Sequence, residues 1–139
     1  MREISFNKLI PELSVKDYNI SIDFYVNILG FNVEYTREED KFSMISINDA
    51  QIMIEEINNH WSTGELKYPF GRGINFQIEV KNVEKIVQEL NKNNIKLFRE
   101  IEENWYEVGG KQYGNKEFLV QDPDGYLLRF FEDIGIKNQ

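Results

Sequence analysis

The sequence predicts an α+β fold in which two βαβββ modules form a cupped mixed sheet with helices on the outside. Two observations predict it. Stretches with the two-residue alternation of β-strands surround two stretches with helical periodicity. A shift of 65 positions also places Val15 on Val80 and Asp17 on Asn82, so the second half of the chain repeats the first.

The first module is predicted to be a strand, a helix and three further strands. Residues 9–15 form the first strand, and residues 17–29 carry Ile20, Phe24 and Ile28 at helical spacing. Gly30 follows the last periodic residue, where a left-handed helix cap is expected. The remaining strands are predicted at residues 31–35, 42–47 and 51–57, with a turn at residues 48–49 between the last two.

The second module repeats this order. We predict a strand at residues 74–80, a helix at 83–93, and strands at 95–98, 116–120 and 126–131. Residues 60–73 are the predicted linker within a single domain spanning residues 1–139, whose modules cover approximately 8–57 and 73–132. Residues 102–114, which include Gly109 and Gly110, are predicted to be irregular.

Composition excludes several classes of function. A net charge of −8 opposes binding to nucleic acid or to an anionic membrane and favours a cationic small molecule. No apolar run reaches the ~18 residues that span a bilayer, and the first residues lack a signal-peptide pattern, so a cytoplasmic location is expected. The chain has no Cys, one His and no Gly-x-Ser-x-Gly pattern, which leaves nucleophilic catalysis without support.

The most informative motif is Asp122-Pro123-Asp124-Gly125, a tight turn between two apolar runs. Together with the segment 11–17 and the Leu-Gly-Phe of residues 29–31, it resembles the glyoxalase / bleomycin-resistance / extradiol-dioxygenase superfamily, also called vicinal oxygen chelate proteins. Residues 113–118, ahead of the turn, are similar to a segment of the bleomycin-resistance proteins. The resemblance covers nearly the whole chain and implies the same fold.

The resemblance also implies where a metal would bind. The usual ligand positions fall on Ile10, near Gly73 and on Arg129, where metal-dependent members carry His or Glu. None of these residues donates to a metal, so we expect no metal site, no cofactor and no catalytic residue. His60 is interpreted as a surface or structural residue. We expect four strand carboxylates to be solvated or paired: Glu12, Glu55, Glu79 and Glu117.

If the metal positions of the family face a cavity, strand alternation predicts the residues that line it. Aromatic residues in the linker and in residues 102–114 would stack on a flat cation. We expect Arg129 to bind an anionic group of the ligand or to pair with Glu12 or Glu79, and we favour the internal pair. The predicted ligand-binding residues are Phe42, Met44, Glu55, Trp61, Gln77, Trp105, Tyr106, Tyr113 and Arg129.

The resemblance implies a non-catalytic homodimer that sequesters a cationic aromatic antibiotic or metabolite in a cleft at the dimer interface. One alternative is a metal-dependent lyase, isomerase or dioxygenase of the same superfamily, with its ligands at displaced positions. Another is a structural or regulatory dimer in which an acidic groove meets a protein partner.

Overall fold

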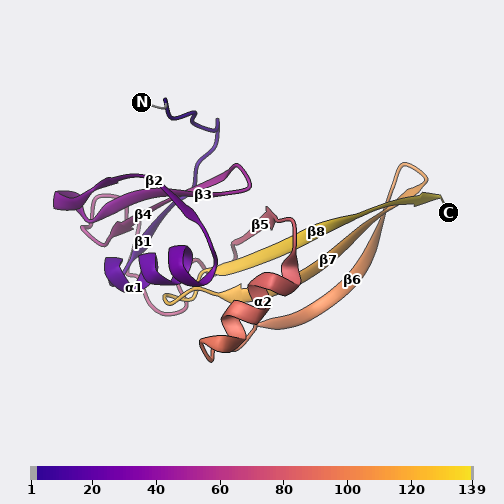
Figure 1. The fold of residues 1–139 in the computed structure, drawn as a ribbon. Coiled ribbons are helices and arrows are strands. Elements are labelled where there is room, and N and C mark those ends of the chain that lie inside the picture. The colour runs from indigo at the N-terminus through magenta and orange to yellow at the C-terminus, as the bar shows by residue number, and fades with distance from the viewer. Residues whose placement is uncertain (1–2, 139) are drawn as a thin grey trace.

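Two four-stranded sheets make up the protein, whose computed structural model describes residues 3–138 (Figure 1). The strand orders are β1-β4-β3-β2 and β5-β8-β7-β6, and in each sheet the first strand of the module pairs in parallel with the last. The first module contains β1 (Glu12–Val15), α1 (Tyr18–Ile22), the π-helix η1 (Asp23–Ile28), β2 (Asn32–Arg37), the 3-10 helix η2 (Glu38–Asp40), β3 (Phe42–Ile47) and β4 (Ala50–Glu56). The second contains β5 (Asn75–Glu79), α2 (Val83–Lys92), β6 (Arg99–Val108), β7 (Lys111–Gln121) and β8 (Leu127–Asn138). This repeated topology confirms the predicted fold of two βαβββ modules.

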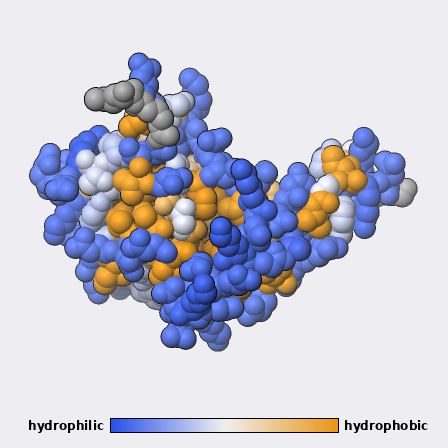
Figure 2. Space-filling view, viewed as in Figure 1, coloured by the Kyte–Doolittle hydropathy of each residue, from blue (hydrophilic) through white to orange (hydrophobic). Residues whose placement is uncertain are grey.

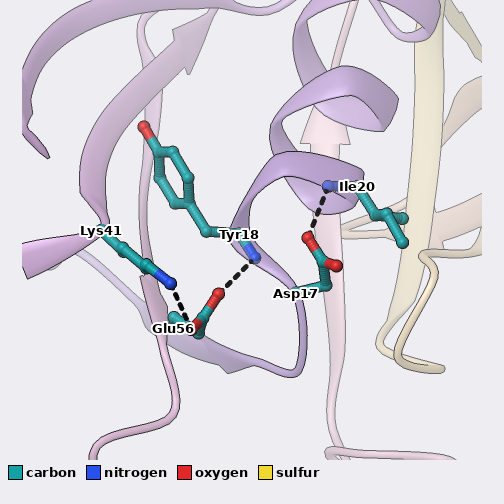
Figure 3. A network of polar contacts seen from close by, with 5 residues as sticks. All are labelled: Asp17, Tyr18, Ile20, Lys41 and Glu56. Atoms are coloured by element: carbon teal, nitrogen blue, oxygen red, sulfur yellow. Dashed lines mark hydrogen bonds and ion pairs between the residues drawn. The ribbon is translucent and has the colours of Figure 1, made fainter.

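The first helix begins at a network of polar contacts (Figure 3). The Asp17 carboxylate caps α1 by accepting a hydrogen bond from the backbone N–H of Ile20 at 3.1 Å. Glu56, at the end of β4, accepts from the backbone N–H of Tyr18 at 3.0 Å and from Lys41 Nζ at 3.2 Å. These contacts fix the start of the helix on the sheet beside it.

The helix predicted at residues 17–29 is not a uniform α-helix, because it continues as the π-helix η1 after α1. The wider turn is visible in the hydrogen bond from Leu29 N to Phe24 O, which spans five residues. Gly30 then ends the helix with φ +92°, as the cap prediction requires. Within residues 3–138, no helix has the length and apolar character to cross a membrane.

One predicted irregular segment and one predicted strand are wrong. Residues 102–114 form most of the β6–β7 hairpin, whose turn is Gly109-Gly110 with φ +60° and +81°. Residues 95–98 are not a strand, and β6 instead begins at Arg99. The shorter hairpin of the first module turns at Asn48 and Asp49, as predicted, and the backbone of both residues is left-handed, with φ 48° and 69°.

The outer parts of β6, β7 and β8 project from the body as a three-stranded ribbon, which we call the arm (residues 104–115 and 133–138; Figure 1). Figure 2 shows apolar surface on the arm at a distance from the body. The ring of Trp105 packs over Gly114, where an added Cβ would lie 2.6 Å from it, and Lys137 Nζ lies 3.9 Å from the ring centroid. Trp105, Gly114 and Lys137 therefore lie on the same face of the arm.

A single hydrophobic core runs through both modules. In the first sheet Ile45 and Ile54 are fully buried, and in the second Phe118 and Phe130 stack at 5.4 Å in the same cluster as Leu90 of α2. Each sheet therefore buries the face that carries its helix. We call the opposite face of each sheet its open face.

The turn at residues 122–125 fastens the second module to the first. The buried Tyr25 hydroxyl donates to Asp122 Oδ2 at 2.7 Å, and the backbone N–H of Lys16 donates to Asp124 Oδ1 at 3.2 Å. Burial raises the pKa of Asp122 to about 6, although the hydrogen bonds from Tyr25 and from the backbone N–H of Tyr126 lower it. Buried polar contacts thus join the modules in addition to the shared core.

Candidate functional site

The open face of the second sheet carries the polar residues that the strand phase predicts. Phe118 and Phe130 point toward the core, and their neighbours along the strands therefore point away from it. Arg129 of β8 lies opposite Gln77 of β5 on one side and Leu119 of β7 on the other. These three side chains share the open face.

Glu117 is the most enclosed acidic residue on this face, with 7% of its surface exposed. Its Oε1 accepts hydrogen bonds from the Tyr106 hydroxyl at 3.2 Å and from Asn104 Nδ2 at 3.4 Å. Its Oε2 is buried and has no hydrogen-bond partner. Burial and the neighbouring Glu117 carboxylate raise the pKa of Tyr106, whereas the charge of Arg129 lowers it. Of the two expected states, solvated or paired, Glu117 is therefore not solvated, and only one of its two oxygens has hydrogen-bond partners.

The Arg129 side chain makes no ion pair or hydrogen bond with any residue between 3 and 138, and its Nε is buried without a partner. The internal pair with Glu12 or Glu79 that we favoured is therefore wrong. Burying part of a cation without a partner is unfavourable, so the guanidinium retains donors for a group that arrives from outside.

The open face of the first sheet is acidic and aromatic. Phe42 and Met44 are buried there, outside the main core. The guanidinium carbon of Arg37 lies 4.6 Å from the centroid of the Phe42 ring, a cation–π contact that the sequence reasoning did not identify. Burial raises the pKa of Glu12, the Glu55 carboxylate raises it further, and Arg37 lowers it. Two carboxylates and one cation therefore share this face.

The predicted aromatic residues do not form one cluster. Tyr106 and Tyr113 are cross-strand partners on the open face of the arm. Trp105 lies on the other face, because consecutive strand residues point in opposite directions and its ring covers Gly114. Trp61 lies in the linker, with 67% of its surface exposed. The segment 102–114, predicted to be irregular, is a regular hairpin, so its aromatic residues are divided between two faces of the arm.

The residues at the metal positions implied by the resemblance do not fit a divalent ion. Ile10 and Arg129 offer no metal-binding oxygen or imidazole, and Gly73 precedes β5, whose first residue is Asn75. Residues 3–138 contain no group of three or more His, Cys, Asp or Glu side chains placed to hold a metal.

A groove of about 620 Å³ lies elsewhere, between the end of η1, the β3–β4 turn and the start of α2. Its lining combines apolar residues such as Ile28 and Ile86 with Lys81 and Lys85, and it includes none of the predicted ligand-binding residues. The groove is therefore distinct from both open faces.

Known proteins resemble this chain over most of its length. A bleomycin resistance protein from Geobacillus stearothermophilus is 27% identical over 135 residues, covering 90% of this chain and 96% of that protein. A lactoylglutathione lyase from Escherichia coli O157:H7 is 27% identical over 129 residues, covering 87% of this chain and 88% of the lyase. The crystal structure of TioX from Micromonospora sp. ML1 shares the fold, with a TM-score of 0.70 at 14% identity, covering 93% of this chain and 100% of that one.

The family model that matches this chain covers residues 8–130 and therefore includes both modules. The match agrees with the two-module topology and with the turn at residues 122–125. The chain belongs to the Glyoxalase/Bleomycin resistance protein/Dioxygenase superfamily.

Proposed function

We propose that this protein binds a small molecule without changing it chemically, and that it captures a cationic aromatic antibiotic or metabolite on its open faces. The observation that carries the proposal is Arg129, a half-buried cation that makes no ion pair with residues 3–138. It stands where the resemblance implies a metal-binding carboxylate in metal-dependent members. A guanidinium at that position repels a metal ion and offers hydrogen bonds instead. Similarity to a bleomycin resistance protein supports capture as the activity.

The two open faces would contribute different interactions. On the first sheet, the carboxylates of Glu12 and Glu55 would attract a cation, and the net charge of −8 would draw it in over a longer range. On the second sheet, hydrogen-bonding and aromatic groups would orient the ligand. The ligand-binding residues of the proposal are Glu55, Trp61, Gln77, Tyr106, Tyr113 and Arg129, whereas Phe42 and Met44, which are buried, would support the first open face from within.

We further propose that the binding cleft closes between two subunits. Within one chain the two open faces belong to separate sheets. The arm also exposes apolar side chains that a second subunit could cover, since Tyr113 lies between Tyr106 of β6 and Ile136 of β8 and all three are exposed. A homodimer would bury this surface and bring residues of two subunits to one ligand.

The alternative activity is that of a metal-dependent lyase, supported by similarity to a lactoylglutathione lyase. The Glu12 and Glu55 carboxylates interact closely enough for Glu55 to raise the pKa of Glu12, so this pair is the place to seek displaced metal ligands. A metal held there would need further oxygen ligands from outside the pair.

Calorimetric titration of the metal-stripped protein with bleomycin tests the proposal, followed by titration with zinc, nickel and manganese. Capture predicts tight binding without metal at about one ligand per chain. Binding of a metal at about one ion per chain, with no binding of bleomycin, would overturn capture in favour of the lyase.

A pair of charge-matched variants tests the role of the first open face. Glu55→Gln should weaken the binding of a cationic ligand, because it removes a carboxylate from the proposed site. Glu89→Gln, on helix α2, removes the same charge from the helix-bearing side of the second sheet and should leave affinity nearly unchanged. Equal effects of the two substitutions would mean that only net charge matters and that the site is elsewhere.

A further inference from the structure

We infer that Glu117 and Arg129 form an anchor for an α-amino-acid head group, with Glu117 binding its ammonium and Arg129 its carboxylate. The inference rests on the proposed function and specifies the group by which a captured molecule is held. It starts from two buried side-chain atoms that lack hydrogen-bond partners, Glu117 Oε2 and Arg129 Nε. These atoms belong to groups of opposite charge on one sheet face.

The strand register places the two groups close to each other without pairing them. Glu117 lies opposite Phe131, and Arg129 lies opposite Leu119, so Glu117 and Arg129 occupy diagonal positions on β7 and β8. Diagonal neighbours on one face of an antiparallel pair have Cα atoms about 7–8 Å apart. Their charged atoms nevertheless form no ion pair within 4.0 Å. The two charged groups are therefore near neighbours on one sheet face that do not satisfy each other.

The charges of the pair determine which group fits best. A buried acceptor or donor without a partner destabilises the protein, most of all when it is charged, so a ligand that pairs both atoms gains from satisfying them. An ammonium supplies donors to Glu117, and a carboxylate accepts from Arg129. Hydrogen bonds between charged groups are about twice as strong as neutral ones, which favours a zwitterion over a neutral amide.

The neighbours of the anchor indicate what the rest of the ligand contains. Phe131 and Leu119 are the cross-strand partners of the two charged residues, and both are apolar. Tyr106, which is 44% exposed, donates to the other oxygen of Glu117. Because Glu117 Oε2 has no contact with solvent, binding requires a side chain of the open face to move, and Tyr106 is exposed enough to do so. An aromatic side chain on the amino acid suits this surface.

Three ligands with the same aromatic side chain test the anchor on the unaltered protein. L-phenylalanine carries both charges, L-phenylalaninamide lacks the carboxylate, and N-acetyl-L-phenylalanine lacks the ammonium. NMR titration of the isotope-labelled protein measures their affinities and locates the perturbed backbone amides. We expect both derivatives to bind at least about tenfold more weakly than phenylalanine, because each loses one charge-assisted contact.

Two variants assign each charge to its partner. Glu117→Gln should abolish the preference for phenylalanine over its N-acetyl derivative and keep the preference over the amide. Arg129→Met should have the converse effect. Glu107→Gln, at an exposed position of β6, is the charge-matched control and should change neither preference. Thermal unfolding of each variant verifies that it is folded before its affinities are compared.

The outcomes separate the anchor from the capture proposal. If bleomycin binds but the three phenylalanine ligands bind equally well or not at all, the anchor is refuted while capture stands. If neither bleomycin nor phenylalanine binds, capture itself fails and the anchor fails with it. If both Glu117→Gln and Arg129→Met kept the full preference for phenylalanine, the anchor would also be overturned, because other groups of the protein would then bind the two charges of the ligand.

Discussion

Replacing Asp122 with Asn should remove a large part of the pH dependence of the protein's stability. The Asp122 carboxylate accepts at Oδ1 from the backbone N–H groups of Asp124 and Tyr126, both at 2.9 Å, and at Oδ2 from the Tyr25 hydroxyl. An amide at this position keeps the acceptor for both backbone groups and can donate to the hydroxyl oxygen. The Asp122→Asn variant therefore resembles the protonated acid in shape and charge.

The size of the effect follows from the raised pKa of Asp122. Its ordinary value of 3.8 rises to about 6 in the folded protein, so the native state holds the proton more tightly than the unfolded chain. The stabilisation from this group is fully present below pH 3.8 and is lost as pH rises through about 6. At 1.36 kcal/mol per pKa unit the loss is about 3 kcal/mol, and solvent screening reduces it little because Asp122 is buried.

Urea unfolding of the native protein and of Asp122→Asn between about pH 4 and pH 7.5 measures the effect. The stability of the native protein minus that of the variant should fall by about 2 kcal/mol across this range, because part of the full loss has already occurred at pH 4. Glu56 and Glu84, whose pKa values are lowered by hydrogen bonds, titrate in both proteins and cancel in the difference. A difference that rises with pH would mean that the hydrogen bonds to Asp122 outweigh its burial, and the reasoning would be refuted.

Three other predictions concern packing, capping and stacking. Phe130→Ala should destabilise the protein by about 3–5 kcal/mol in urea unfolding, since it removes one ring of the fully buried Phe118–Phe130 pair. A loss of stability below about 1 kcal/mol would contradict this packing. Asn82→Ala should cost about 1 kcal/mol by removing the α2 cap, whereas Asn82→Asp should retain most of it. Trp61→Ala should weaken bleomycin binding by about 1 kcal/mol or more in calorimetry. Trp105→Ala should leave the affinity unchanged, because the Trp105 ring covers Gly114. If only Trp105→Ala weakened binding, the ligand would lie on the Trp105 face of the arm.

Sequence patterns identify elements well where one face is buried. The bounds of β3 agree with prediction, and those of α2 agree to within one residue, because Ile86 and Leu90 recur at helical spacing on a buried face. Apolar periodicity does not predict the strands of the arm, because these strands project from the core and neither face of the arm needs alternating apolar residues. The π-helix is hidden for a different reason, because Phe24 and Ile28 have the same spacing in an α-helix.

The candidate site was harder to predict than the fold. Alternation places Gln77 and Arg129 on the same face, but it does not reveal whether a partner is within reach of the guanidinium. The burial of Glu117 depends on Tyr106, which approaches from a strand that the sequence pattern missed. The two apolar residues that follow Glu117, Phe118 and Leu119, were a usable signal, because a carboxylate at the start of a buried apolar run in a strand is poorly placed for solvation.

The turn at residues 122–125 also constrains how the chain folds. The contacts of Asp122 with Tyr25 and of Asp124 with Lys16 join residues separated by 97 and 108 positions. Such long-range contacts raise the contact order and slow folding, since a large loop must close before they form. During synthesis, the first module emerges long before the turn that completes it. The first module therefore cannot complete its contacts at Lys16 and Tyr25 until the turn at residues 122–125 has been synthesised.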